Sequence, residues 1–176
     1  VGVVAAVNHG KWVDSVLMTI SVFGISAPAF WIAIILQIVI CLKFNLLPLS
    51  GIDSFKSFIL PGIALGTRYA ASIARITRTS MLDVLSQDYI RTAEAKGLKG
   101  WVVTIKHALR NALIPIITIA GSDLGNILTG SVLVESVFSI PGIGKMLVDS
   151  INTRDLPIVQ GGVMYIAVIC VIMYLV

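Results

Sequence analysis

Long apolar stretches separated by short polar segments dominate this chain. Residues 15–42 contain no charged side chain, and further apolar runs extend over 58–80, 108–135 and 156–176. About twenty apolar residues in a helix cross the hydrocarbon core of a bilayer. The pattern therefore predicts four membrane-spanning helices, with residues 1–7 as the end of an earlier span that is only partly present.

A proline interrupts the first long run. Pro28 lies near the middle of 15–42, and a proline removes one backbone hydrogen bond from a helix. We therefore expect this helix to bend at Pro28.

The region before the last run predicts a helix of another kind. Apolar side chains recur there at helical spacing, on the face opposite Lys145 and Asp149, at Ile143, Met146, Leu147 and Ile151. This spacing predicts a short amphipathic helix lying in the membrane interface. Asp155, just before Pro157, is expected to cap the final helix.

The polar segment Asp83–Pro115 is the longest interruption of the apolar pattern. Seven of the 13 Lys and Arg residues lie between Arg75 and Arg110, against three acidic residues. The window thus carries seven minus three, or +4, which equals the net charge of the whole chain. Because basic residues collect in cytoplasmic loops, we expect this segment in the cytoplasm. Its length favours a docking surface over a simple chain reversal.

Composition supports a membrane protein with one domain over residues 1–176. Hydrophobic residues form 57% and charged residues 12% of the chain, whereas soluble domains have about half and about a quarter. The positive charge is not interleaved with aromatic residues on a soluble domain, so no nucleic-acid partner is expected. Cys41 and Cys170 lie far apart in apolar runs, which argues against a disulfide framework. The chain does not start with Met, and we interpret it as a piece of a longer protein.

Several motifs resemble one family of transport proteins. Asp88–Leu98 reads DYIRTAEAKGL, and His107–Pro115 reads HALRNALIP. Both are similar to the cytoplasmic "EAA" loop of binding-protein-dependent ABC importer permeases. They match the version found in the first permease subunit of peptide and nickel uptake systems, whereas the general form of the loop is degenerate here. Two further stretches, starting at Val132 and Asn152, extend the resemblance over most of the chain.

The resemblance implies an all-α fold, a polytopic transmembrane helical bundle that is part of a type I ABC importer permease core. It implies a multi-pass protein of the inner (plasma) membrane of a bacterium or archaeon, embedded in the lipid bilayer. The implied partners are a second homologous permease subunit, two cytoplasmic ABC ATPase subunits and an extracytoplasmic solute-binding protein. The chain would form half of the translocation pathway for small peptides or nickel, with no cofactor and no catalytic residue of its own.

The same resemblance implies that residues 83–107 form the coupling loop that docks on the ATPase. The residues expected to make this contact occupy one short helix and the turn after it: Asp88, Tyr89, Arg91, Thr92, Ala93, Glu94, Ala95, Lys96 and Gly97. Small residues such as Ala93 and Gly97 would allow close approach of the partner. A side chain at Gly97 would block either the bend or the fit.

Arg68, Asp123 and Asn126 are polar residues inside apolar runs. Ionisable groups at membrane depth are costly and usually face a bundle interior or an aqueous path. These three residues are therefore candidates for the translocation pathway, and Arg68 could pair with Asp123. The alternative is that Arg68 extends to the membrane surface and Asp123 has a purely structural role.

Other chemistry finds little support. GIGK at Gly142–Lys145 resembles the end of a phosphate-binding loop, but Met146 replaces the required Ser or Thr, so ATP hydrolysis is expected on another chain. His9 and His107 lack metal-ligand spacing, and no metal site is expected. Two further function classes stay open. A passive channel or facilitator would not need the coupling loop, and an intramembrane enzyme would depend on Asp123.

Overall fold

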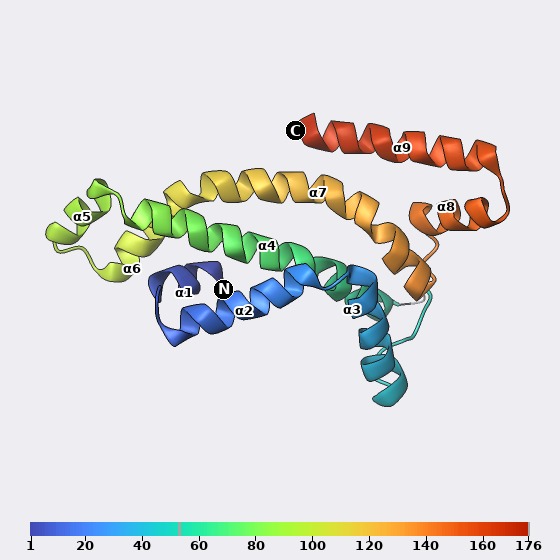
Figure 1. The fold of residues 1–176 in the computed structure, drawn as a ribbon, viewed down its shortest axis with the longest axis horizontal. Helices are drawn as coiled ribbons and strands as arrows, with labels where there is room; N and C mark the ends of the chain where they lie inside the picture. The colour runs from blue at the N-terminus through green and yellow to red at the C-terminus, as the bar shows by residue number, and fades with distance from the viewer. Residues whose placement is uncertain (53, 176) are drawn as a thin grey trace. The chain divides into compact units, whose positions relative to one another are not determined.

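The structure is a computed structural model that describes residues 1–52 and 54–175, and the side chains of all of these except 128–130. The described residues form helices joined by turns, without a strand (Figure 1). In chain order the first elements are α1 (Gly2–Val7), α2 (Trp12–Ser26), α3 (Ala29–Leu36), a π-helical segment Gln37–Lys43 and a 3-10 turn Phe55–Phe58. They are followed by α4 (Ile59–Leu85), α5 (Asp88–Ala95), α6 (Gly100–Val102), a π-helical segment Val103–Leu109, α7 (Arg110–Phe138), α8 (Ile143–Asn152) and α9 (Leu156–Leu175). The predicted all-α fold class is confirmed.

Two helical stretches are long and apolar enough to cross a membrane, Gly100–Ile127 and α9. Two more qualify if the helices on either side of a break are counted together: α2 with Ala29–Lys43, and Ser131–Phe138 with α8. Within the described part of the chain, α4 is not among these stretches, although it has 27 residues, and it contains three arginines. Insertion of each predicted span therefore stays a prediction. The last residue of the predicted span 156–176 lies outside the described residues.

Pro28 separates α2 from α3. Its backbone is extended, with φ −62° and ψ 138°, and its carbonyl accepts hydrogen bonds from the N–H groups of Trp31 (3.0 Å) and Ile32 (3.2 Å). Proline has no N–H to continue the hydrogen bonds of α2, so Pro28 starts a new helix. The bend expected at this residue is a complete break.

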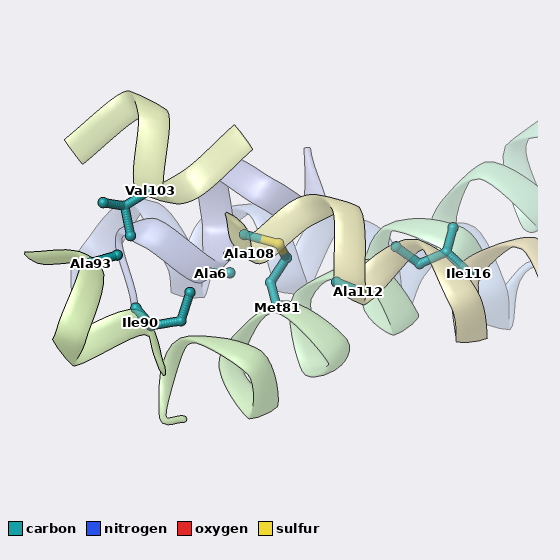
Figure 2. Packing of buried hydrophobic residues seen from close by; sticks show 8 residues of the cluster. All are labelled: Ala6, Met81, Ile90, Ala93, Val103, Ala108, Ala112 and Ile116. Atoms are coloured by element: carbon teal, nitrogen blue, oxygen red, sulfur yellow. The ribbon is translucent and has the colours of Figure 1, made fainter. Parts of the chain in front are cut away.

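Contacts divide the chain into two compact units. Unit 1 comprises residues 1–25 and 69–120, and unit 2 comprises residues 26–68 and 121–176. The buried core of unit 1 consists of Ala6, Met81, Ile90, Ala93, Val103, Ala108, Ala112 and Ile116 (Figure 2). Half of these residues are alanines, and small side chains let helix backbones approach closely. The core of unit 2 consists of Ala33, Cys41, Leu60, Ala64, Val134 and Phe138.

In unit 2, Glu135 joins α7 to the start of α8. Its Oε2 accepts hydrogen bonds from the backbone N–H groups of Gly144 (2.8 Å) and Lys145 (3.1 Å), and its Oε1 accepts one from Ser131 Oγ (2.8 Å). The first N–H groups of a helix have no partner within the helix and favour a negative charge. A Cβ at Gly144 would lie 2.9 Å from Glu135 Oε2. The GIGK segment thus binds a carboxylate of its own chain.

The predicted short helix before the last apolar run is present as α8, and the predicted cap of α9 is confirmed. Asp155 Oδ1 accepts a hydrogen bond from the Ile158 N–H at 3.4 Å. Of the four apolar residues that predicted α8, only Leu147 is buried. It packs against Gly162 of α9, where an added Cβ would lie 2.5 Å from Leu147 Cδ2. The placement of α8 in the membrane interface stays a prediction.

Substitution of two adjacent glycines should separate packing from helix propensity. We expect Gly162→Val to destabilise the full-length protein by about 1–3 kcal/mol relative to Gly161→Val, because overpacking forces Leu147 from its position. Gly161 is exposed, and an added Cβ there meets nothing within 4 Å. The measurement is thermal unfolding in detergent. Leu147→Ala should recover part of the loss in the Gly162→Val protein, and equal midpoints for the two glycine variants would contradict this packing.

Candidate coupling surface

Helix α5 has one buried face and one exposed face. Ile90 and Ala93 are 1% and 6% exposed. The other residues predicted to contact the ATPase are all exposed: Asp88, Tyr89, Arg91, Thr92, Glu94, Ala95, Lys96 and Gly97. The predicted coupling residues therefore lie together on α5 and the turn after it, and only Ala93 among them is buried in unit 1. Its small side chain fits the core of this chain.

The buried face attaches α5 to three other segments of unit 1. Ile90 and Ala93 belong to the same cluster as Ala6 of α1, Met81 of α4 and Val103 (Figure 2). A force applied to the exposed face of α5 would therefore act on these segments as well.

A polar contact adds to this attachment. The Asn111 Nδ2 group of α7 donates a hydrogen bond to the Tyr89 hydroxyl at 2.9 Å. Both residues belong to the motifs quoted above, DYIRTAEAKGL and HALRNALIP, but the motifs do not reveal that they meet. Sequence reasoning had not singled out Asn111.

The turn after α5 depends on Gly97. Its N–H donates to the Glu94 carbonyl at 2.8 Å, and the Leu98 N–H donates to the Ala93 carbonyl at 3.4 Å. This pair of bonds is the Schellman arrangement, which requires a left-handed residue after the helix. Gly97 has φ +75°, and an added Cβ there would meet nothing within 4 Å. Glycine is therefore favoured at position 97 by the left-handed backbone conformation and not by a lack of space within this chain.

A hollow of about 630 Å³ lies beside α5 in unit 1. Glu94 reaches it from α5, and Val7 of α1 and Leu85 of α4 line its walls together with Trp101 and Ile105. Trp101 is 68% exposed and Ile105 is 50% exposed. Exposed aromatic residues are enriched where proteins bind partners, so we include this hollow in the candidate coupling surface.

The exposed charges around α5 are mostly basic. Arg91 and Asp88 form an ion pair of 3.7 Å, but both side chains are strongly exposed, so the pair contributes little to stability. Lys96, Lys99 and Lys106 are also exposed. Apart from Arg78, which pairs with Asp14, the seven basic residues counted between Arg75 and Arg110 are exposed on unit 1, where they can orient an approaching partner.

Among the described residues, no ion pair or hydrogen bond joins the candidate pathway residues Arg68, Asp123 and Asn126 to one another. Arg68 is exposed on α4, and no ion pair joins it to Asp123 among the described residues. The Oδ2 atom of Asp123 is buried and has no hydrogen-bond partner in the described part of the chain. Asn126 instead contacts α9, since its Oδ1 accepts a hydrogen bond from the Tyr174 hydroxyl at 3.0 Å. The possible Arg68–Asp123 pair is absent from this structure.

A comparison with known protein families decides the class of this chain. The family described as "Binding-protein-dependent transport system inner membrane component" matches residues 1–176. The chain belongs to this family. Its resemblance to the permeases of binding-protein-dependent importers is thereby confirmed, as is a place in the inner membrane.

Curated relatives of this inner membrane component carry a more specific name. The glutathione transport system permease protein GsiC of Escherichia coli (strain K12) is 47% identical over 163 residues, which cover 93% of this chain and 53% of that protein. GsiC of Salmonella choleraesuis (strain SC-B67) is 46% identical over 164 residues, which cover 93% of this chain and 54% of that protein. The chain thus spans about half the length of the relatives it matches.

Replacement of Gly97 should loosen the end of α5. A left-handed backbone costs an L-residue roughly 1–2 kcal/mol, so Gly97→Ala should speed hydrogen exchange of the amides in residues 88–98 by about tenfold. Gly97→Asn should have a smaller effect, because Asn tolerates this conformation. Exchange is followed by mass spectrometry of the full-length protein. Gly100→Ala is the matched control, since an added Cβ there also meets nothing and Gly100 does not have a positive φ. Equal exchange in the two alanine variants would contradict the role of Gly97.

Proposed function

We propose that this member of the inner membrane component family is a permease subunit of an ATP-driven importer, and that a separate ATPase moves it through α5. The observation that carries the proposal is the division of α5 into two faces. One face is polar and exposed, and the other is buried in the core of unit 1 through Ile90 and Ala93. A helix built in this way can receive a partner and pass on its displacement.

The mechanism follows from these contacts. The ATPase would seat against the exposed residues of α5, and the hollow lined by Trp101 would accept side chains next to it. Closure of two ATPase subunits on ATP would displace both α5 helices of a permease pair. Because the interior of a packed unit is close to incompressible, the displacement would carry the end of α4 and the start of α7 with it.

The proposed partners are a second homologous permease subunit, two cytoplasmic ATPase subunits and an extracytoplasmic binding protein. As substrate we propose glutathione or another small peptide, because the relatives GsiC are named for glutathione transport. Nickel is the alternative left by the sequence motifs. Asp123 is the residue we propose for the pathway, since its buried Oδ2 has no partner among the described residues and could receive one from the second permease or the substrate.

A passive channel is the second candidate function. It would need no partner at α5, and it therefore predicts that the exposed face of this helix is dispensable. Substitutions on that face distinguish the two functions.

Crosslinking tests the partner of α5. A cysteine at Lys96, in a protein whose Cys41 and Cys170 are replaced by Ser, should crosslink to the ATPase in membranes that contain the whole transport system. The matched control is Lys145→Cys on α8. The predicted span 108–135 separates α8 from the cytoplasmic segment, so α8 is expected on the outer side and this cysteine should not reach the ATPase. The reverse pattern would overturn the proposal.

Transport provides the functional test. Arg91→Glu with Lys96→Glu reverses two exposed charges, one on α5 and one directly after it. We expect ATP-dependent uptake to fall tenfold or more, which corresponds to about 1.4 kcal/mol. The amount of inserted protein should not change, because both side chains are exposed. Unchanged uptake would support the passive channel instead.

A further inference from the structure

An ion pair in unit 1, between the buried Asp14 and the partly buried Arg78, joins the start of α2 to α4. Asp14 is 4% exposed. Its Oδ1 accepts a hydrogen bond from Arg78 Nε at 2.6 Å, and its Oδ2 accepts one from Arg78 Nη2 at 2.7 Å. Two parallel charge-assisted bonds of this kind are strong and define one orientation of the partners.

Two further groups lie beside the same carboxylate. The Gly10 N–H donates a hydrogen bond to Asp14 Oδ2 at 3.2 Å, and the His9 Nδ1 atom lies 3.2 Å from Asp14 Oδ2 and 3.0 Å from Arg78 Nη2. The hydrogen bonds from Arg78 in particular hold the pKa of the Asp14 carboxyl well below its usual range, so Asp14 is ionised at neutral pH. Asp14 precedes the predicted span 15–42, and a buried charge there is tolerated only because it is fully paired.

Arg78 lies on the part of α4 that leads into α5. About two helical turns separate it from Leu85, the last residue of α4, and α5 begins at Asp88. Helix α1 packs against the same part of α4, because a Cβ added at Gly2 would collide with the Ala74 carbonyl and lie 2.6 Å from Thr77 Cβ. Helix α1 and the start of α2 thus both contact the last part of α4, and this part of α4 leads directly into α5.

We propose that the Asp14–Arg78 pair is the joint that makes the start of α2 move together with α5. Both residues are positioning residues, and this role rests on the proposed function of α5 as the element moved by the ATPase. Two features of the structure support the joint. The contacts group residues 1–25 with residues 69–120 in one unit, and the pair bridges 64 residues of sequence within it. No other described carboxylate forms an ion pair between side chains this distant in the chain.

Spin-label distances test whether the two parts move as one. Labels at Lys11→Cys and Gln87→Cys, in full-length protein with Cys41 and Cys170 replaced by Ser, report on the turn before α2 and on the start of α5. Both positions are exposed and neither belongs to the pair. In the assembled transport system we expect one narrow distance that ATP does not change. A wild-type distance that shifts on addition of ATP would overturn the joint.

Substitutions of the pair test its role in transport. Arg78→Lys keeps the charge but cannot form the two-armed contact, so it should insert normally, broaden the distance distribution and lower the solute imported per ATP hydrolysed by tenfold or more. Asp14→Ala and Arg78→Ala should also broaden the distance distribution and lower the solute imported per ATP. The double variant should import as much solute per ATP as either single variant, since each single substitution already removes the pair. Arg75→Ala is the matched control, because Arg75 is exposed on the same helix and forms no ion pair among the described residues. Arg75→Ala should change neither the distance distribution nor the solute imported per ATP hydrolysed.

The outcomes separate this inference from the proposed function. ATP-dependent uptake that is insensitive to Arg78→Lys and to both alanine substitutions would overturn the joint alone. Uptake by the wild-type system that does not depend on the ATPase would overturn the proposed function and the joint with it.

Discussion

The burial of Ile90 and Ala93 is the interaction on which the candidate site depends. Without it, α5 would be a helix of eight residues with a polar surface, and isolated helices shorter than about 12 residues are marginal in water. Packing against α1, α4 and the segment before α7 stabilises α5 and leaves its other face exposed. The same contacts that hold the helix in place would carry a displacement into unit 1. The stability of α5 and the proposed coupling therefore have one physical origin.

Three carboxylates near or within apolar segments differ in the partners that the structure gives them. Asp14 is paired with Arg78, and Glu135 accepts backbone N–H groups at the start of α8. Both carboxylates join segments that would otherwise be separate. Asp123 differs, because one buried oxygen has no partner among the described residues. A buried acceptor without a partner is costly, and this cost is the reason why Asp123 is the acidic residue that we propose for the translocation pathway.

Glycine and proline act at particular backbone positions. Pro28 ends one helix and starts another, and Gly97 adopts the left-handed conformation that ends α5. Gly162 acts differently, since it makes room for Leu147 between α8 and α9. The sequence indicated a bend at Pro28 and the importance of Gly97, because these residue types have strong local conformational preferences. It did not indicate the packing at Gly162.

By itself, the sequence determined the all-α class, the approximate positions of the helices and the family, because apolar runs, capping residues and long motifs are local properties of the chain. It also identified the segment that contains α5. Only the tertiary structure decided which residues of this segment are exposed, that Ala93 belongs to the core, and that Asp14 meets Arg78 across 64 residues. These outcomes depend on contacts between distant segments, and no local pattern of residues specifies which distant segment will supply the partner.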